Sequence, residues 1–343
     1  MTLPTGVESP VIDLPAAEAP IEDALAPLGL HALAETDIAS QLVGEPPVRV
    51  SLGFRIATLA VVILPFVGAV TAMALLWGVS LSWIHLVLFG VGYILTGLGV
   101  TIGYHRYFTH KSFDTHPIIK AALGILGSVA VQGPIVTWVA AHRKHHQHSD
   151  RHDDPHSPHQ HGEAVGEFIR GFIHAHCGWL IRLKPVDIER YAPDLVSDKL
   201  TRRISQLFPL WVLLGLLVPT AIALAFTGTW SGALLGLLWG GAVRIFFVHH
   251  ITWSVNSVCH LWGRQAFRSR DHSRNNVIFG VLALGEGWHN NHHAFPTSAR
   301  HGLMWWQFDI SYLIIRAMER LGLVWNVRVP SPVRITNARL PRD

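Results

Sequence analysis

"LFPLWVLLGLLVPTAIALAFT", residues 207–227, has no charged side chain, and a second apolar stretch, 230–252, follows after only Gly228 and Thr229. About 20 apolar residues in a helix, at roughly 1.5 Å each, cover the hydrocarbon core of a bilayer, which is about 30 Å thick. Two spanning helices joined by so short a turn run in opposite directions. The sequence therefore predicts a transmembrane helical hairpin over residues 207–252.

An earlier part of the chain repeats this pattern. Apolar stretches 56–77 and 83–103 are joined by the uncharged turn "GVSLS", which predicts a first hairpin within residues 49–103. Half of all residues are hydrophobic and only 15% are charged, as is typical of membrane proteins. The two cysteines allow at most one disulfide and form no CxxC motif, which favours a reducing compartment.

The distribution of positive charge predicts the orientation. Lys and Arg are concentrated in residues 104–206 and after Thr252, while the two short turns contain none. The positive-inside rule therefore places both termini and both long segments in the cytoplasm. An Ala- and Arg-rich chain without an evident organelle-retention signal favours a bacterial plasma membrane. The lack of a basic cluster or a known nucleic-acid module argues against DNA or RNA as a partner.

Three further segments have distinct expectations. Residues 1–48, rich in Ala, Pro and acids, are interpreted as a disordered tail. Residues 118–139 are apolar but contain Lys120 and the break "QGP", so we expect them to lie at, or dip into, the cytoplasmic leaflet. Arg244 lies within the fourth span, where a charged side chain normally faces protein or water, and we expect a buried structural role.

Histidines recur in three dense clusters, each after an apolar segment. "HRYFTH" (105–110) and "HRKHH" (142–146) lie in the segment 104–206, and "HNNHH" (289–293) lies in the segment 253–343. The i, i+3, i+4 spacing of the last two places three side chains on one helix face. The i, i+5 spacing of the first is about 140° around a helix, so we expect the chain to leave the helix there. Neutral imidazole binds iron, zinc or copper, and the clusters predict a site for one or two metals.

A solvated histidine-rich surface is the alternative interpretation of these clusters. Three clusters on one membrane face, two with identical spacing, favour a metal site over such a surface.

Other histidines and their neighbours have separate expectations. In "TWSVNSVCH", Trp253, Asn256 and His260 form one helical stripe, which by itself indicates packing. His249 and His250 are also expected to pack. The carboxylates expected to support metal-binding imidazoles are Asp153, Asp154 and Glu286. The histidines expected in a solvated loop are His148, His152, His156, His159 and His161.

Together "HRYFTH", "HRKHH" followed by "DDPH", "TWSVNSVCHLWG" and "GEGWHNNHHAFP" resemble the membrane fatty acyl-CoA desaturases of the stearoyl-CoA, carbon-nine type. The resemblance extends from about Leu98 to Leu323. Asn291 stands where many relatives have Tyr, and residues 1–48 match nothing. The resemblance implies an all-α integral membrane fold, with four transmembrane helices as two hairpins and a cytoplasmic helical cap that holds a di-iron site.

The resemblance also implies residue roles. An acyl tunnel would bend beside Gln132, Trp138, Thr252 and Trp253, and Asn256 would reach one iron through water. The nine implied iron ligands are His105, His110, His142, His145, His146, His260, His289, His292 and His293.

The implied function is the O2-dependent insertion of a cis double bond, at carbon nine, into a long-chain acyl-CoA such as stearoyl- or palmitoyl-CoA. The implied partners are acyl-CoA, O2, membrane lipid and an external electron donor (a reductase, a ferredoxin or a b-type cytochrome), because no heme-binding segment is present. Three alternatives stay open: a related di-iron hydroxylase, an acyl-lipid desaturase and, with less support, a metal transporter.

Overall fold

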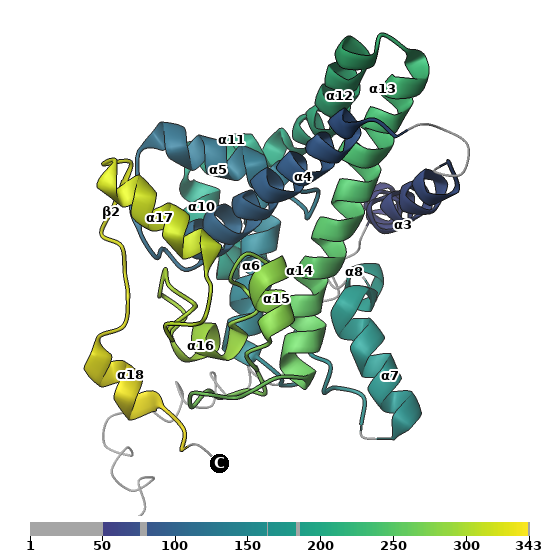
Figure 1. Cartoon of the computed structure of the whole chain (residues 1–343). Coiled ribbons are helices and arrows are strands. Elements are labelled where there is room, and N and C mark those ends of the chain that lie inside the picture. The colour runs from purple at the N-terminus through teal and green to yellow at the C-terminus, as the bar shows by residue number, and fades with distance from the viewer. Residues whose placement is uncertain (1–50, 76–80, 163, 183–185, 342–343) are drawn as a thin grey trace, which may run out of the picture. The chain divides into compact units, whose positions relative to one another are not determined.

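The structure, a computed structural model, describes residues 51–75, 81–162, 164–182 and 186–341, which are predominantly helical (Figure 1). The predicted tail, 1–48, lies outside the described residues. The elements are α3 (Leu52–Leu75), α4 (Trp83–Leu98), the π-helix η2 (Gly99–Thr109), β1 (Asp114–Thr115), α5 (Pro117–Val129), α6 (Ile135–His148), α7 (Val165–Ile173), η3 (His174–Gly178), α8 (Trp179–Arg182), α9 (Ile188–Tyr191), α10 (Pro193–Ser197), α11 (Lys199–Gln206), α12 (Phe208–Thr227), α13 (Trp230–Gly236), η4 (Leu237–Val243), α14 (Arg244–Leu261), α15 (Val277–Leu282), α16 (His289–Ala294), α17 (Ile310–Arg320), β2 (Val324–Trp325) and α18 (Pro332–Ala338).

Within the described residues, four continuous helical runs are long and apolar enough to cross a membrane, which indicates an integral membrane protein. The second run continues to Thr109 and the fourth to Leu261, beyond the ends expected from hydropathy. These extensions carry His105 and His260, so the apolar helices themselves position part of the histidine set. The four runs are Arg55–Leu75, Trp83–Thr109, Phe208–Thr227 and Trp230–Leu261.

Helices α12 and α13 lie side by side, joined by Gly228 in the left-handed region (φ 66°) (Figure 1). Small residues allow the close approach. A Cβ added at Gly236 would lie 2.3 Å from the Cβ of Ala223, so only glycine fits there without displacement. This packing fixes the fourth helical run against the third.

Helix α3 packs against η4, where a Cβ added at Gly68 would lie 2.3 Å from that of Ala242. The residues that join α3 to α4, 76–80, lie outside the described ones. The first hairpin therefore stays a prediction, and the observed contacts of α3 include η4, α14 and α8.

The expected break in residues 118–139 is confirmed. Helix α5 ends at Val129, α6 begins at Ile135, and Gly133 between them has a positive φ of 101°. Both helices pack against η2. The segment therefore forms two helices instead of one, and α6 brings the second histidine cluster beside the first, while its expected place in the cytoplasmic leaflet stays a prediction.

Arg244 has the buried structural role expected from its position. Its side chain is 2% exposed and donates hydrogen bonds to three carbonyl oxygens, those of Gly240 (2.8 Å), Val129 (3.0 Å) and Gly215 (3.3 Å). The guanidinium therefore joins α14 to the end of α5 and to the interior of α12.

A short antiparallel sheet is the departure from an all-helical chain within the described residues. β1 pairs with β2, with Asp114 opposite Trp325 and Thr115 opposite Val324. The pair ties the end of η2 to the end of α17.

Gly127 on α5 is predicted to be essential for packing against η2. A Cβ there would lie 2.4 Å from the ring of Tyr104, whose hydroxyl is hydrogen-bonded to Ser128 and Gly133 and cannot move freely. We expect Gly127→Ala to reduce the free energy of unfolding by about 1–3 kcal/mol, measured by denaturation in detergent. Gly166→Ala is the control, because no atom lies within 4 Å of its added Cβ; an equal loss in both variants would contradict the packing argument.

Candidate metal centre

The first histidine cluster lies in a π-helix. The N–H of His110 donates to the carbonyl of His105 at 3.2 Å, an i to i+5 bond, and the two ring centroids are 4.9 Å apart. The expectation that the chain leaves the helix between these residues is therefore wrong. The helix widens instead, and the wider turn places residues five apart on the same face.

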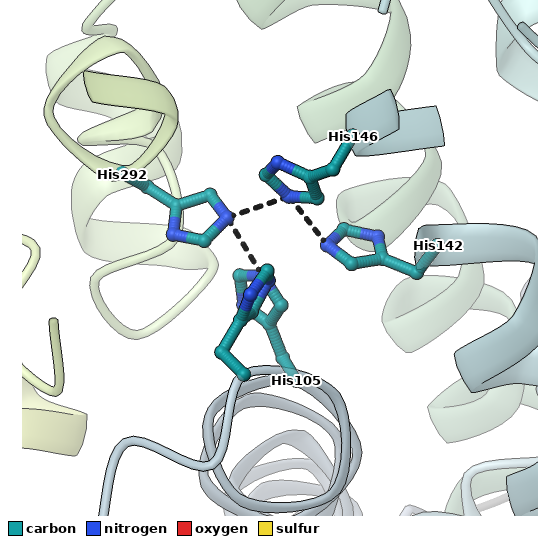
Figure 2. A group of neighbouring side chains, drawn as sticks. His105, His142, His146 and His292 are labelled. Carbon is teal, nitrogen blue, oxygen red and sulfur yellow. Dashed lines mark hydrogen bonds between the residues drawn. The ribbon is translucent and has the colours of Figure 1, made fainter. Parts of the chain in front are cut away.

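Five histidines converge, from η2 and the residue that follows it, from α6 and from α16, and Figure 2 labels four of them. The Nε2 atom of His292 lies 3.0 Å from that of His105 and 2.9 Å from that of His146, and the Nε2 atoms of His146 and His142 are 3.0 Å apart. Figure 2 shows the rings of His142 and His146, both on α6, pointing toward those of His105 and His292. The five-histidine group consists of His105, His110, His142, His146 and His292.

Four further histidines form a second group beside it. The Nε2 atom of His289 lies 3.0 Å from that of His260 and 3.1 Å from that of His293, and His145 completes the four-histidine group. The i, i+3, i+4 clusters are thus divided between the two groups instead of serving one. All nine predicted histidines lie in these two groups, and the contacting pair His105 and His292 is separated by 187 residues in the sequence.

Both groups fit a transition metal. Two imidazole nitrogens at about 2.1 Å from one ion, at a right angle, are about 3.0 Å apart, which is the separation observed. Burial, followed by the neighbouring imidazoles, lowers the pKa of His142, His146 and His292 well below the usual value. These rings are therefore neutral near pH 7 and have a lone pair available for a metal.

A model of the fatty acid desaturase family matches residues 81–327, a range that contains both histidine groups. The chain belongs to the fatty acid desaturase family. Such enzymes are oxidoreductases of lipid metabolism that act on a fatty acyl substrate with O2 and use iron, and the donor set of nine imidazoles suits that metal.

Curated relatives share this assignment but differ in the acyl carrier that their names give. The desaturase is 43% identical over 280 residues, 81% of this chain and 87% of the relative, to a hex-5-enoyl-[acyl-carrier protein] acetylenase of Moorena producens (strain JHB). It is 39% identical over 240 residues (69% and 81%) to an sn-1 stearoyl-lipid 9-desaturase of Anabaena variabilis. It is also 39% identical over 258 residues (74% and 74%) to an acyl-CoA 5-desaturase of Anemone leveillei.

Carboxylates accept hydrogen bonds from the Nδ1 atoms of four of the desaturase's histidines. Two of these carboxylates, Asp154 and Glu286, were expected from the sequence. Asp153 was also expected, but this prediction is wrong, because its side chain is 64% exposed and, within the described residues, forms an ion pair with the exposed ring of His152 instead of with a histidine of either group. The four pairs are His105–Glu286 (2.6 Å), His145–Asp154 (3.0 Å), His260–Asp150 (2.9 Å) and His293–Asp271 (2.6 Å).

Sequence reasoning missed Asp150 and Asp271. They lie 110 and 22 residues from the histidines that they contact, so only the folded chain reveals the pairs. Burial alone would raise the pKa of Asp271, but the adjacent His293 outweighs it and holds the pKa well below the usual value. The carboxylate is therefore ionised and fixes the ring's Nδ1–H, which leaves Nε2 free to bind metal.

Histidines outside the predicted set divide into two kinds. His152 is exposed, as expected for a solvated loop, whereas His156 is 3% exposed and its ring centroid lies 4.3 Å from that of His145. The solvated-loop prediction is wrong for His156, because Asp154 accepts its backbone N–H and turns the loop inward. Sequence reasoning also missed His301, which is fully buried with its Nδ1 3.3 Å from Glu286.

A cavity of about 400 Å³ lies against the two groups. His105 and His142 line it from one group and His289 from the other, together with Asn256. Its remaining wall is mainly apolar, from α3, α4, α6, α12 and α14. The four residues expected to shape an acyl tunnel, Gln132, Trp138, Thr252 and Trp253, all line this cavity.

Three of those four residues are joined by hydrogen bonds across the cavity wall. The Gln132 amide donates to the Thr252 hydroxyl at 2.8 Å and accepts from the Trp138 indole N–H at 3.2 Å. This link connects the break between α5 and α6 to α14. It fixes the wall close to His142, whose ring stacks on that of Trp138.

Neighbouring aspartates provide a matched test of the histidine support. We expect Asp154→Asn to weaken iron binding by about 10- to 100-fold, because the variant removes the charge that orients His145. Asp153→Asn changes an exposed carboxylate and should bind iron like the unaltered protein. Titration of the metal-free protein with iron under anaerobic conditions measures both affinities. Equal affinities would show that the Asp154 contact does not support the site.

Proposed function

We propose that the chain is a membrane di-iron desaturase that inserts a cis double bond into a long saturated acyl chain, at carbon nine of an acyl-CoA such as stearoyl-CoA. The main observation that supports this proposal is the apolar cavity, which is lined by histidines of both groups. An apolar cavity suits a hydrocarbon chain, because burial of each methylene contributes about 0.8 kcal/mol.

The nine histidines would hold two iron ions, and Asn256 would reach the ion of the four-histidine group through water. The irons would supply the O2-dependent oxidation of unactivated methylenes, for which no side chain is a sufficient oxidant. The protein's own contribution is position. The wall formed by Gln132, Thr252 and Trp138 would hold one pair of carbons beneath the histidines and exclude water.

The remaining requirements come from outside the chain. Electrons would come from a separate donor, such as a ferredoxin, a b-type cytochrome or a reductase. The four apolar runs would span a bacterial plasma membrane as two hairpins, with the termini and the histidine-bearing cap in the cytoplasm. Residues 49–103 and 207–252 would form the hairpins, and 104–206 and 253–343 the cytoplasmic segments.

A second candidate is desaturation of an acyl chain linked to a membrane lipid. The described residues that line the cavity include no Lys or Arg, whereas the phosphates of CoA favour such side chains. Relatives named as lipid desaturases also match at 39% identity. The product assay therefore compares acyl chains attached to different carriers.

The test is a product assay with purified protein, an electron-donor system and O2. Stearoyl-CoA, stearoyl-acyl-carrier protein and a stearoyl lipid are supplied separately, and mass spectrometry locates the double bond. The proposal expects a carbon-nine cis alkene from stearoyl-CoA. An alkene formed only from the lipid would support the second candidate. A hydroxylated product would show that the chain catalyses hydroxylation instead of desaturation.

Tyr93 is predicted to limit the chain length. Cavity-lining residues recur along one helix face at Tyr93, Gly97, Thr101 and His105, so Tyr93 lies on the order of 18 Å from the histidines. Its hydroxyl donates to the carbonyl of Leu282, which holds the ring in place. We expect Tyr93→Ala to raise activity on longer chains relative to shorter ones, by up to about fourfold per added methylene. An unchanged preference across an acyl panel would rule out this role.

A further inference from the structure

Carboxylates are distributed unequally between the two histidine groups. In the four-histidine group, three of the four rings donate Nδ1–H to an aspartate: His145 to Asp154, His260 to Asp150 and His293 to Asp271. The side chains of these aspartates are at most 6% exposed. The other partners of Asp150 and Asp271 include the hydroxyls of Ser157 and Ser273, which are neutral.

In the five-histidine group, Glu286 is the carboxylate that the described residues place within ion-pair distance of a ring. It contacts His105 at 2.6 Å, but its other oxygen accepts from Arg106 at 2.6 Å. Arg106 is fully buried and also pairs with Asp309 at 3.1 Å. In this group, therefore, one carboxylate contacts a ring, and a buried guanidinium partly neutralises its charge.

The difference matters for any ion bound there. A ring that donates Nδ1–H to a carboxylate is a stronger electron donor through Nε2, and a buried negative charge stabilises the more highly charged ion. Three rings that donate to a carboxylate belong to the four-histidine group, and one belongs to the five-histidine group. The extra ring of the five-histidine group is neutral and does not offset two full negative charges.

We propose that the two iron positions are electrostatically unequal, so that the four-histidine position keeps its ion ferric after one electron has reduced the diferric centre. The five-histidine position then takes the first electron, and the four-histidine position takes the second at a lower potential. Each step adds one electron from an external reductant to one ferric ion. This inference rests on the proposed di-iron function.

Two charge-removing variants of similar size test it in opposite directions. Asp271→Asn removes a charge from the four-histidine group and should raise the lower potential. Glu286→Gln removes one from the five-histidine group and should raise the higher potential. The readout is the comproportionation constant, which measures how far two half-reduced centres are favoured over one oxidised and one reduced centre. It is obtained from a mediated reductive titration followed by electron paramagnetic resonance.

The expected constant falls at least about threefold in Asp271→Asn and rises at least about threefold in Glu286→Gln. The assignment would be overturned if the constant changed in the same direction in both variants, if the two directions were reversed, or if one or both variants left the constant unchanged. Iron content is measured on each sample, and Asp150→Asn replaces Asp271→Asn if that variant fails to hold two irons. If the unaltered protein itself binds no iron pair, the proposed function fails, which is distinct from a bound pair that shows no inequality.

Discussion

Replacement of His146 by alanine is expected to lower the iron content from about two to about one ion per chain and to reduce desaturation at least about 100-fold. His146 is central to its group, because its Nε2 lies 3.0 Å from that of His142 and 2.9 Å from that of His292. Loss of one imidazole opens the position between the remaining rings and weakens metal binding strongly. Elemental analysis and the product assay measure the two effects.

His148 provides the matched control on the same helix. It lies two residues after His146 on α6, belongs to neither histidine group and contacts the hydroxyl of Tyr191 at 3.4 Å. His148→Ala should keep both irons and most of the activity. Iron loss in His148→Ala equal to that in His146→Ala would indicate that the loss reflects general disruption of α6, not a missing ligand.

Replacement of Arg106 by methionine is expected to reduce the free energy of unfolding by about 3–5 kcal/mol. The guanidinium is fully buried, pairs with Glu286 and Asp309 and donates to the carbonyl of Ala299 at 3.0 Å. Methionine fills much of the volume but leaves two buried carboxylates without their cation. Denaturation of the metal-free protein in detergent separates this loss from any change in iron binding.

Arg316→Met is the control for the loss of an arginine ion pair. Arg316 pairs with Glu319 one helical turn away, and its side chain is 43% exposed. A solvent-screened pair contributes at most about 1 kcal/mol. Similar losses in the two variants would mean that the Arg106 network does not stabilise the fold beyond an ordinary surface pair.

The sequence was sufficient for features that depend on local pattern. Apolar length predicted four spanning runs, and the "QGP" break predicted the turn between α5 and α6. The three histidine clusters predicted that eight of the imidazoles come together in a metal site, whereas His260 was expected there only from the family resemblance. Each of these signals lies within about 20 consecutive residues.

Features that depend on contacts between distant segments were not predictable. The division of His142, His145 and His146 between two groups depends on where η2, α14 and α16 approach α6. The pairing of His260 with Asp150 joins residues 110 positions apart. The widening of η2 replaces α-helical geometry, on which the spacing argument relied, so the cluster "HRYFTH" gave the wrong local expectation.

Anomalous X-ray diffraction at the iron absorption edge, on crystals of the anaerobically purified protein, tests the two-ion centre most directly. We predict two anomalous peaks, one within ligand distance of the five-histidine group (His105, His110, His142, His146 and His292) and one within ligand distance of the four-histidine group (His145, His260, His289 and His293). One peak, or peaks bound to residues outside these two groups, would contradict the assignment of a di-iron centre to the nine histidines.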